Sequence, residues 1–265
     1  GNISKTGGTE STLTIQAERI NMNGYTITNS SAISGGKLNV VLWTGFSDGN
    51  GAGVSALNSI TTLGGGVWIG GSSTAGASAT WAPYAGGANL VVGDTGAKGK
   101  LNNNWNSIDL NGTITTANGN ILIWAGPAYS TGNGLNAAAT STLNSGSGSI
   151  TIRGDTFDFN SVDVRISTAN QNTTGGGWIV IAGSFTDANA PLSSPPATTT
   201  LLNPLPTGYA NNNPSSHTGL SIGTDNRTAH TSGVKMYSGS GNIILRGRSS
   251  STYTTCCTTG LTTYG

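Results

Sequence analysis

The sequence predicts an all-β fold in which short strands stack as a solenoid. Three observations support this prediction: low charge, short apolar runs that alternate with polar residues, and one motif that recurs along the chain. Of the 265 residues, 8% are charged and 35% are hydrophobic, and Gly, Thr, Ser and Asn make up more than half. Helical bundles and coiled coils need many more charged residues, so this composition excludes them.

The composition also narrows the class of function. A formal net charge of +1 offers no basic field to nucleic acid. No apolar run approaches the ~18 residues that a membrane helix needs. We therefore expect neither nucleic-acid binding nor membrane insertion. The periodic apolar clusters argue against a disordered chain.

One motif, a glycine and a polar residue followed by alternating apolar residues, recurs through the chain. Its strands start at intervals of 23 to 31 residues, at Leu13, Leu38, Val67, Leu90, Ile121, Ile150 and Ile179. The last copy, at Ile243, follows after about two periods. A period in the twenties is typical of a solenoid, and a chain of this length then makes about 10 turns.

Each period also contains a second group of alternating residues, which we expect to add further strands. Copies occur at 20–28, 108–115, 157–166 and 234–236. Asn-Gly pairs at 23–24 and 111–112 predict tight corners, because both residue types tolerate the left-handed conformation. Each turn then makes about three short strands. Their inward side chains become buried only when turns stack at ~4.8 Å.

Three segments interrupt the repeat and are predicted to loop out, near 70–88, 126–147 and 184–217. The first two are rich in Gly, Ser and Ala, and the third holds six of the eight prolines. Proline cannot donate to a strand ladder. The chain 1–265 is thus expected to be a single solenoid segment with loop excursions. If the segment binds a specific ligand, the loops are the expected place; passive loops are the alternative.

Two stretches resemble a known family. Residues 11–20 (STLTIQAERI) with 35–43 (GGKLNVVLW), and residues 107–124 (SIDLNGTITTANGNILIW), resemble the repeats of filamentous-haemagglutinin-like exoproteins. These are large bacterial surface adhesins, often of the two-partner-secretion type. The resemblance implies a right-handed parallel β-helix, an extracellular location at the bacterial cell surface, and a role in adhesion or biofilm formation. The secretion domain of that family is not recognisable in this chain.

A glycan-binding or glycan-degrading β-helix protein is the alternative function, because parallel β-helices also host polysaccharide lyases and hydrolases. Such enzymes need clustered acidic groups. The richest stretch holds Asp155, Asp158 and Asp163. Strand alternation turns Asp158 and Asp163 outward, and Arg165 shares a face with Asp163. We interpret these residues as surface charges and predict no catalytic residue.

The remaining residues with chemical potential do not form a recognisable site. His217 and His230 lack a G-x-S-x-G motif, and residues 48–51 (DGNG) lack the other ligands of a calcium loop. We therefore predict no cofactor and no metal. The only cysteines, Cys256 and Cys257, are adjacent. Three states remain open for them: free thiols, a vicinal disulfide, or a link to another chain.

Aromatic residues and threonine pairs suggest two further kinds of binding face. Stacked tryptophans bind sugar rings, but alternation predicts that no single face collects Trp43, Trp68, Trp124 and Trp178. Thr-x-Thr pairs at 26/28 and 113/115 suggest an ice-binding face. The strands taken as equivalent carry Asn21, Asp158 and Lys235, so a regular threonine face is not expected.

The ends of the chain carry no pattern of a capping helix and fall within the repeat. We expect further repeats or another copy of the chain to cover them. The predicted function is a structural or adhesive segment of a bacterial extracellular fibre or large surface adhesin, which assembles or continues end to end. Host or surface glycans are the partners expected for its loops.

Overall fold

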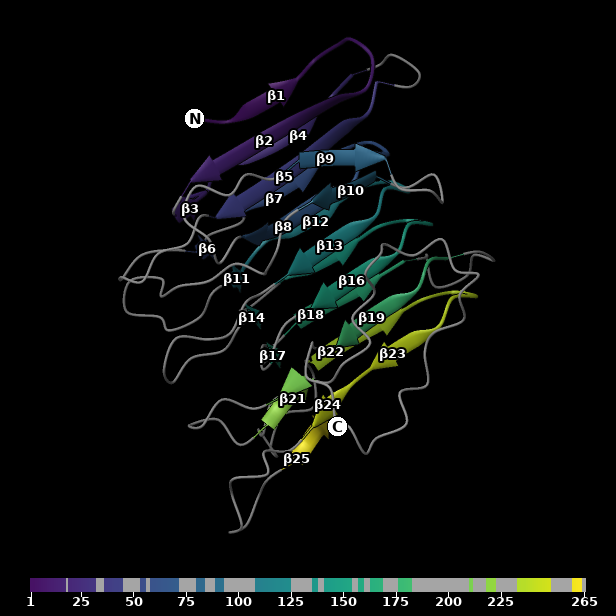
Figure 1. Cartoon of the computed structure of the whole chain (residues 1–265). Coiled ribbons are helices and arrows are strands. Elements are labelled where there is room, and N and C mark those ends of the chain that lie inside the picture. The colour runs from purple at the N-terminus through teal and green to yellow at the C-terminus, as the bar shows by residue number, and fades with distance from the viewer. Residues whose placement is uncertain are drawn as a thin grey trace.

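Three parallel sheets, called A, B and C here, make up most of the computed structural model of this chain (Figure 1). Each sheet has seven strands, and the described residues contain no helix. The all-β, parallel-strand prediction is confirmed, and the arrangement is compatible with a parallel β-helix. The structure describes residues 1–17, 19–31, 36–44, 53–55, 58–71, 80–83, 89–92, 108–124, 135–137, 141–153, 157–159, 163–168, 176–182, 210–211, 218–222, 233–248 and 259–263.

The strands of each sheet pair in their order along the chain. Sheet A contains β1 (Ile3–Lys5), β4 (Thr26–Asn29), β7 (Ser59–Thr61), β12 (Thr113–Thr115), β15 (Thr142–Asn144), β18 (Asp163–Ser167) and β22 (Gly233–Tyr237). Sheet B contains β2 (Ser11–Ala17), β5 (Leu38–Thr44), β8 (Val67–Gly71), β13 (Ile121–Trp124), β16 (Ile150–Arg153), β19 (Ile179–Ala182) and β23 (Ile243–Leu245). Sheet C contains β3 (Arg19–Asn21), β6 (Gly53–Ser55), β11 (Ile108–Leu110), β14 (Leu135–Ala137), β17 (Phe157–Phe159), β21 (Thr218–Ile222) and β25 (Thr259–Thr263).

The chain visits the sheets in a fixed order, A then B then C, and repeats the cycle seven times. We call one visit to each sheet a rung. The first rung is β1, β2 and β3, and the last is β22, β23 and β25. Figure 1 shows the rungs stacked from the N-terminal to the C-terminal end of the molecule. Three strands per turn were predicted and are found, but the described strands form seven rungs rather than about ten.

The lower number has a specific cause. The segment that contains Leu90 was predicted to be a repeat strand, but β10 (Asn89–Val92) pairs antiparallel with β9 (Thr80–Pro83), outside the three sheets. Sheet B instead runs from Val67 directly to Ile121. A second short pair, β20 (Ala210–Asn211) with β24 (Gly247–Arg248), also lies outside the three sheets.

The three predicted excursions agree with the structure to different extents. Residues 80–83 of the first form β9, outside the sheets. The second, 126–147, is too long as predicted, because β14 and β15 inside it belong to sheets C and A. The apolar positions of Leu135–Ala137 and Thr142–Asn144 continue rows of the stack in register. The Gly/Ser-rich composition of 126–147 hid this periodicity in the sequence. Of the third excursion, 184–217, only Ala210–Asn211 lies within the described residues.

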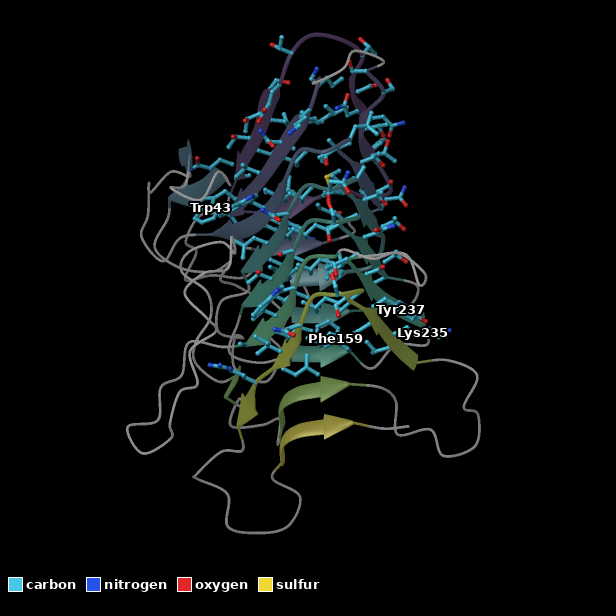
Figure 2. All side chains as sticks on the ribbon, turned by 90° about the vertical axis from the view of Figure 1, so that its right-hand side faces the viewer. Trp43, Phe159, Lys235 and Tyr237 are labelled. Atoms are coloured by element: carbon cyan, nitrogen blue, oxygen red, sulfur yellow. The ribbon has the colours of Figure 1, made fainter. Side chains whose placement is uncertain are left out.

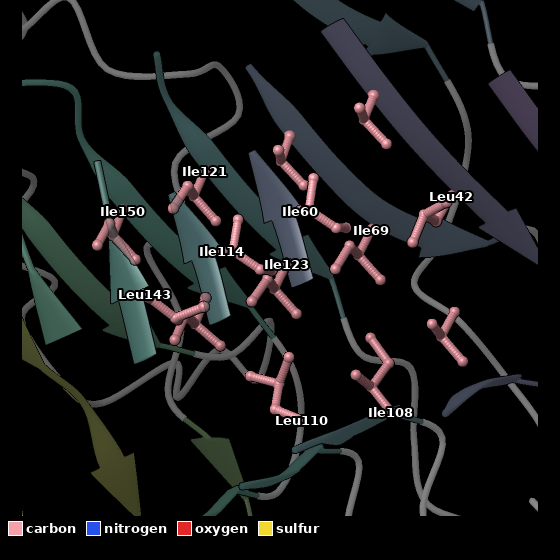
Figure 3. Packing of buried hydrophobic residues seen from close by; sticks show 14 of the residues in the cluster. Leu42, Ile60, Ile69, Ile108, Leu110, Ile114, Ile121, Ile123, Leu143 and Ile150 are labelled. Atoms are coloured by element: carbon pink, nitrogen blue, oxygen red, sulfur yellow. The ribbon is translucent and has the colours of Figure 1, made fainter. Parts of the chain in front are cut away.

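The core consists of rows of aliphatic side chains, one residue per rung. In sheet A, the inward row of Ile27, Ile60, Ile114, Leu143 and Ile166 is 0–2% exposed. Figure 3 shows such residues packed between the sheets, including Ile114 beside Leu143 and Ile121 near Ile150. Each fully buried Ile or Leu contributes about 1.5–3 kcal/mol of hydrophobic stabilisation. Stacking is therefore what makes each rung stable.

The corner between sheets A and B is tight and has a recurrent backbone. Left-handed conformations occur there at Leu63 (φ 53°), Ala117 (φ 49°) and Asn118 (φ 88°), and at glycines 64, 146 and 239. The predicted corner at Asn23–Gly24 is confirmed, with φ of 43° and 82°. The pair at 111–112 joins β11 to β12 without a positive φ.

Candidate functional surfaces

The acidic residues weighed for catalysis lie on two different sheets. Asp158 is on β17 of sheet C, between Phe157 and the fully buried Phe159, whereas Asp163 and Arg165 are on β18 of sheet A. In register, Asp158 stands beside Asn136 and Ser221, so no second acid adjoins it in sheet C. The described residues contain no group of three His, Cys, Asp or Glu that could hold a metal ion.

Several other candidates fall outside the described residues. These are Asp155, the 48–51 turn, His217, His230, Cys256 and Cys257. The sequence interpretation of each therefore remains a prediction.

Trp43, Trp68 and Trp178 share one face of sheet B, so the predicted difference in alternation between Trp68 and Trp178 is wrong, while the side chain of Trp124 lies outside the described part of the chain. Val41 pairs with Trp68 and Trp68 with Leu122. Trp43 follows Val41 by two residues and therefore lies on the same face as Trp68. Trp178 precedes Val180 by two residues, and Val180 continues that row through Thr151. The sequence already allowed this result, because Trp68 follows Val67 by one residue and Trp178 precedes the equivalent Ile179 by one residue, and both odd offsets lie on the same face of a strand.

This tryptophan face is not open. Trp43 and Trp68 are each 2% exposed, and the Val41, Thr151 and Val180 side chains between and beyond them are 0–1% exposed. Gly70 has no side chain, and a Cβ there would lie 2.7 Å from the Trp43 ring. Trp43 and Trp68 thus present no free ring face to a sugar. Figure 2 shows Trp43 on one flank of the stack and Lys235 on the opposite flank.

Two buried polar atoms on the same face of sheet B have no hydrogen-bond partner. They are Nε1 of Trp43 and Oγ1 of Thr151. Both residues belong to strands whose residues are buried on both faces, as in β5 and β19. Near-continuous apolar sequence is typical of parallel strands covered on both sides. Strands β5 and β19 are therefore covered on both faces, whereas β2 keeps an exposed face at Thr12 and Thr14.

Sheet A carries a regular polar face that sequence alignment misassigned. The row of Thr26, Ser59, Thr113 and Thr142 runs beside the row of Thr28, Thr61, Thr115 and Asn144. The Thr-x-Thr pattern therefore spans four rungs, with serine or asparagine at one place in two of them. Arg165 and Lys235 then take the place of the first row on the next two rungs. The pattern does not extend over every rung, and Lys235 interrupts it as expected, whereas Asn21 and Asp158 lie on strands of sheet C.

A hydroxyl marks the corner between sheets A and B on five successive rungs. The side-chain hydroxyl donates to the carbonyl oxygen of a glycine at the start of the next strand. The pairs are Thr62 with Gly65 (2.5 Å), Thr116 with Gly119, Ser145 with Gly148 (2.5 Å), Thr168 with Gly177 (2.7 Å) and Ser238 with Gly241 (2.6 Å). Four of the five pairs share a sequence signal, Ser or Thr followed three residues later by Gly, that the motif search overlooked.

The glycines of these pairs form a row of their own. A Cβ added to Gly119 would lie 2.0 Å from the carbonyl oxygen of Gly65 on the preceding rung. The corresponding distances are 2.3 Å at Gly148, 2.2 Å at Gly177 and 2.1 Å at Gly241, each to the preceding glycine. These five glycines let neighbouring rungs approach closely, and no other residue type fits there without a shift of the backbone.

Side chains next to the glycine row also link one rung to the next. Asn39 Oδ1 accepts from the Gly66 amide (3.0 Å), and Asn120 Oδ1 accepts from the Ser149 amide (2.9 Å). The Ser149 hydroxyl oxygen in turn accepts from the Trp178 amide (3.2 Å). Uncharged side chains therefore satisfy backbone donors along this edge, which explains why so few charges are needed.

The corner between sheets B and C is different, because the longest connections all leave from it. Sheet B strands end at Gly71, Trp124 and Ala182, and the chain next enters sheet C at Ile108, Leu135 and Thr218. All three predicted excursions therefore begin at one corner of the stack. Long insertions on one face of a solenoid often mark its binding face. Two shorter insertions lie elsewhere, at 168–178 between sheets A and B and at 223–232 between sheets C and A.

Comparisons with known proteins identify no relative. No family model, no curated protein and no solved structure matches this chain. Among the described residues, no helix has the length and apolar character needed to span a membrane.

Proposed function

We propose that this chain is a structural and adhesive segment of a bacterial extracellular fibre or large surface adhesin, built as a right-handed parallel β-helix of the filamentous-haemagglutinin-like type. Its mechanical task is to hold the connecting segments of the B–C corner away from the cell on a rod of hydrogen-bonded rungs. The proposed partners are host or surface glycans, bound by those segments, and further rungs at the ends.

One observation carries this proposal: three register-matched sheets run without interruption from the first rung to the last. Such a stack distributes load over many parallel backbone hydrogen bonds. The tight A–B corner and the variable B–C corner separate the task of holding the rod together from that of presenting loops. The low charge fits a fibre stabilised by apolar rows and uncharged ladders.

The first test is where the chain is found and at what mass. Antibodies against the chain are expected to label intact cells, and the denatured mass from those cells should lie far above 26.5 kDa if the segment belongs to a giant exoprotein. A mass of 26.5 kDa would instead indicate a subunit that has to stack with other copies. Labelling that requires lysis of the cells would refute a surface role.

The alternative, a glycan-degrading enzyme, is separated by a screen for sugars released from soluble polysaccharides. The proposal expects no release. Release by the chain that is abolished in Asp158→Ala or Asp163→Ala would replace the fibre proposal with an enzyme. A Thr113→Ala variant is the matched control, because that residue lies on sheet A away from both acids.

A further inference from the structure

We propose that the outward face of sheet A is a binding surface for ice, formed by two columns of small uncharged side chains on rungs two to five. The first column is Thr26, Ser59, Thr113 and Thr142, and the second is Thr28, Thr61, Thr115 and Asn144. We call these eight residues the sheet A array. The inference goes beyond the proposed function, because nothing in the fibre proposal requires an ice surface.

The hydroxyl groups of the array are not used by the fold. Among the residues that the structure describes, none of the array's Thr and Ser hydroxyls forms a hydrogen bond, and all eight side chains are partly exposed. The corner hydroxyls of Thr62, Thr116 and Ser145 differ, because they are buried and each donates to a glycine carbonyl. The array therefore keeps its donors and acceptors for water or a ligand.

The spacing of the array is close to that of an ice surface in two directions. Side chains on successive rungs lie ~4.8 Å apart, and residues i and i+2 of a strand lie ~6.7 Å apart. In ice, each oxygen has tetrahedral hydrogen bonds of about 2.75 Å, so oxygens that share a neighbour lie about 4.5 Å apart and the repeat along the hexagonal axis is about 7.3 Å. The mismatch of ~0.3 Å per rung adds up to about 0.9 Å over four rungs, which is less than one hydrogen-bond length.

The array carries no charge, although charged residues follow it in the same column. Arg165 and Lys235 occupy the first column on rungs six and seven. A charged side chain is costly to remove from its hydration water, whereas a hydroxyl both donates and accepts hydrogen bonds. A neutral array of donors and acceptors is thus complementary to a neutral lattice of water molecules. The second column stays uncharged over six rungs: Ser4, Thr28, Thr61, Thr115, Asn144 and Ser167.

The backbone and the side-chain type hold the array in place. Each of its strands pairs with a strand on both sides, and the residue between its two columns is a buried Ile or Leu, such as Ile60 or Ile114. Threonine is branched at Cβ, which restricts χ1. Binding to a rigid lattice therefore costs little conformational entropy, and eight weak contacts act together.

A crystalline polysaccharide is the other surface that presents an ordered lattice of hydroxyl groups. Sugar rings are recognised by the faces of aromatic side chains, and the array has none. Tyr237, on rung seven, is the only aromatic residue in the described strands of sheet A. Figure 2 shows it beside Lys235, on the flank opposite Trp43. The composition of the face therefore favours ice over a crystalline glycan.

The test is whether the purified chain enters ice that grows slowly from a dilute solution. A protein that does not bind ice is pushed ahead of the growth front, whereas the wild-type chain is expected to be incorporated. Thr115→Tyr places a ring in the middle of the array and should be excluded. Thr14→Tyr is the matched control, because Thr14 is an exposed strand threonine on sheet B. It should enter ice like wild type.

A second variant makes the test independent of one substitution. Thr61→Lys adds a charge to the array without a ring and should also be excluded from ice. Circular dichroism of each variant should show the β signal of wild type. Exclusion of the wild-type chain would overturn the proposal. Incorporation of folded Thr115→Tyr or Thr61→Lys at the wild-type level would also overturn it.

Binding to crystalline cellulose and to crystalline chitin separates the two surfaces. A chain that ice excludes but that binds either solid, and that loses this binding in Thr115→Tyr, would assign the array to a polysaccharide and overturn the ice proposal. The outcome is independent of the test for surface location. A surface-labelled chain that ice excludes would retain the proposed function but remove this inference, and ice binding by a chain found only inside cells would do the reverse.

Discussion

A single missing Cβ governs how closely two rungs approach at the A–B corner. At Gly119 that atom would lie 2.0 Å from the Gly65 carbonyl oxygen, well inside any contact distance. The neighbouring Thr116 hydroxyl is fully buried and donates to the carbonyl of Gly119. Close approach and a satisfied carbonyl therefore depend on two residues three positions apart.

Gly119→Ala should lower the free energy of unfolding by about 1–3 kcal/mol, because the added methyl group forces the backbone of two rungs apart. The measurement is the denaturant midpoint followed by circular dichroism. Gly24→Asn serves as the control, since Gly24 has φ +82° and nothing within 4 Å of its Cβ position, and asparagine tolerates that conformation. Equal midpoints for the two variants would contradict the role assigned to the glycine row.

Thr116→Val should destabilise the fold by about 1–3 kcal/mol, because the Gly119 carbonyl loses a buried donor while the shape of the side chain is kept. Thr113→Val, on the half-exposed face of sheet A, is the control and should change the midpoint little. A neutral Thr116→Val would show that the corner hydroxyl is dispensable.

The glycines of this corner could be found from sequence, but their hydroxyl partners were missed. The repeat motif was aligned on the glycine and on the strand after it, so the Ser or Thr three residues earlier fell outside it. At Thr168 the signal is also hidden, because residues 169–176 separate it from Gly177.

At the scale of the element, inner strands of sheet B such as β5 and β19 are buried on both faces, and the sheet holds two buried polar atoms without a hydrogen-bond partner, Trp43 Nε1 and Thr151 Oγ1. Thr151 occupies a row between Leu122 and Val180, where an aliphatic residue would meet only apolar neighbours in the strands beside it. Its hydroxyl is buried and unpaired. Burying a polar group without a partner costs free energy.

Thr151→Val is therefore expected to raise the free energy of unfolding by about 1 kcal/mol. The same replacement at Thr116, equally buried but hydrogen-bonded, is expected to lower it. If Thr→Val lowers the free energy of unfolding at Thr116 and raises it at Thr151, the difference gives the contribution of the hydrogen-bond partner. Both changes are measured from denaturant curves. A loss of stability at both positions would contradict the assignment of the Thr151 hydroxyl as unpaired.

Elements with strong alternation were predictable, while their register was not. The strands at 12–17, 121–124 and 179–182 were recognised from periodicity alone. Trp68 lies one residue after Val67 and Trp178 one residue before Ile179, and these two strand residues are equivalent in register, so alternation counted from them places both tryptophans on one face. The strand at Leu90 has the right local pattern, but it pairs antiparallel with its neighbour in sequence.

For the whole molecule, stability should decrease from the central rungs toward the ends. Each central rung has a neighbour on both sides, while the end rungs have one, and solenoid stability is close to a sum of such interfaces. The number of turns was overestimated because long connections between sheets B and C consume chain without adding rungs. The stacking itself could be predicted, since one turn cannot bury its own apolar face.

Hydrogen exchange should report this gradient. Amides of β13 and β16 are expected to exchange at least about tenfold more slowly than those of β2 and β23 in the purified chain of residues 1–265. Uniform exchange along this chain would show that it unfolds as one unit rather than from its ends.

The contrast between the two corners has a consequence for how such a chain can change. The glycines of the A–B corner tolerate no added side chain, although residues 169–176 lengthen one of its connections, while a connection between sheets B and C can be as long as 72–107 without altering the order of the sheets. The A–B corner therefore fixes the spacing between rungs, while the connections between sheets B and C can vary in length and sequence. A different sequence inserted at 125–134 or 183–217 would be attached at the rung set by its flanking strands. The rung and the sequence of the loop can therefore be chosen separately.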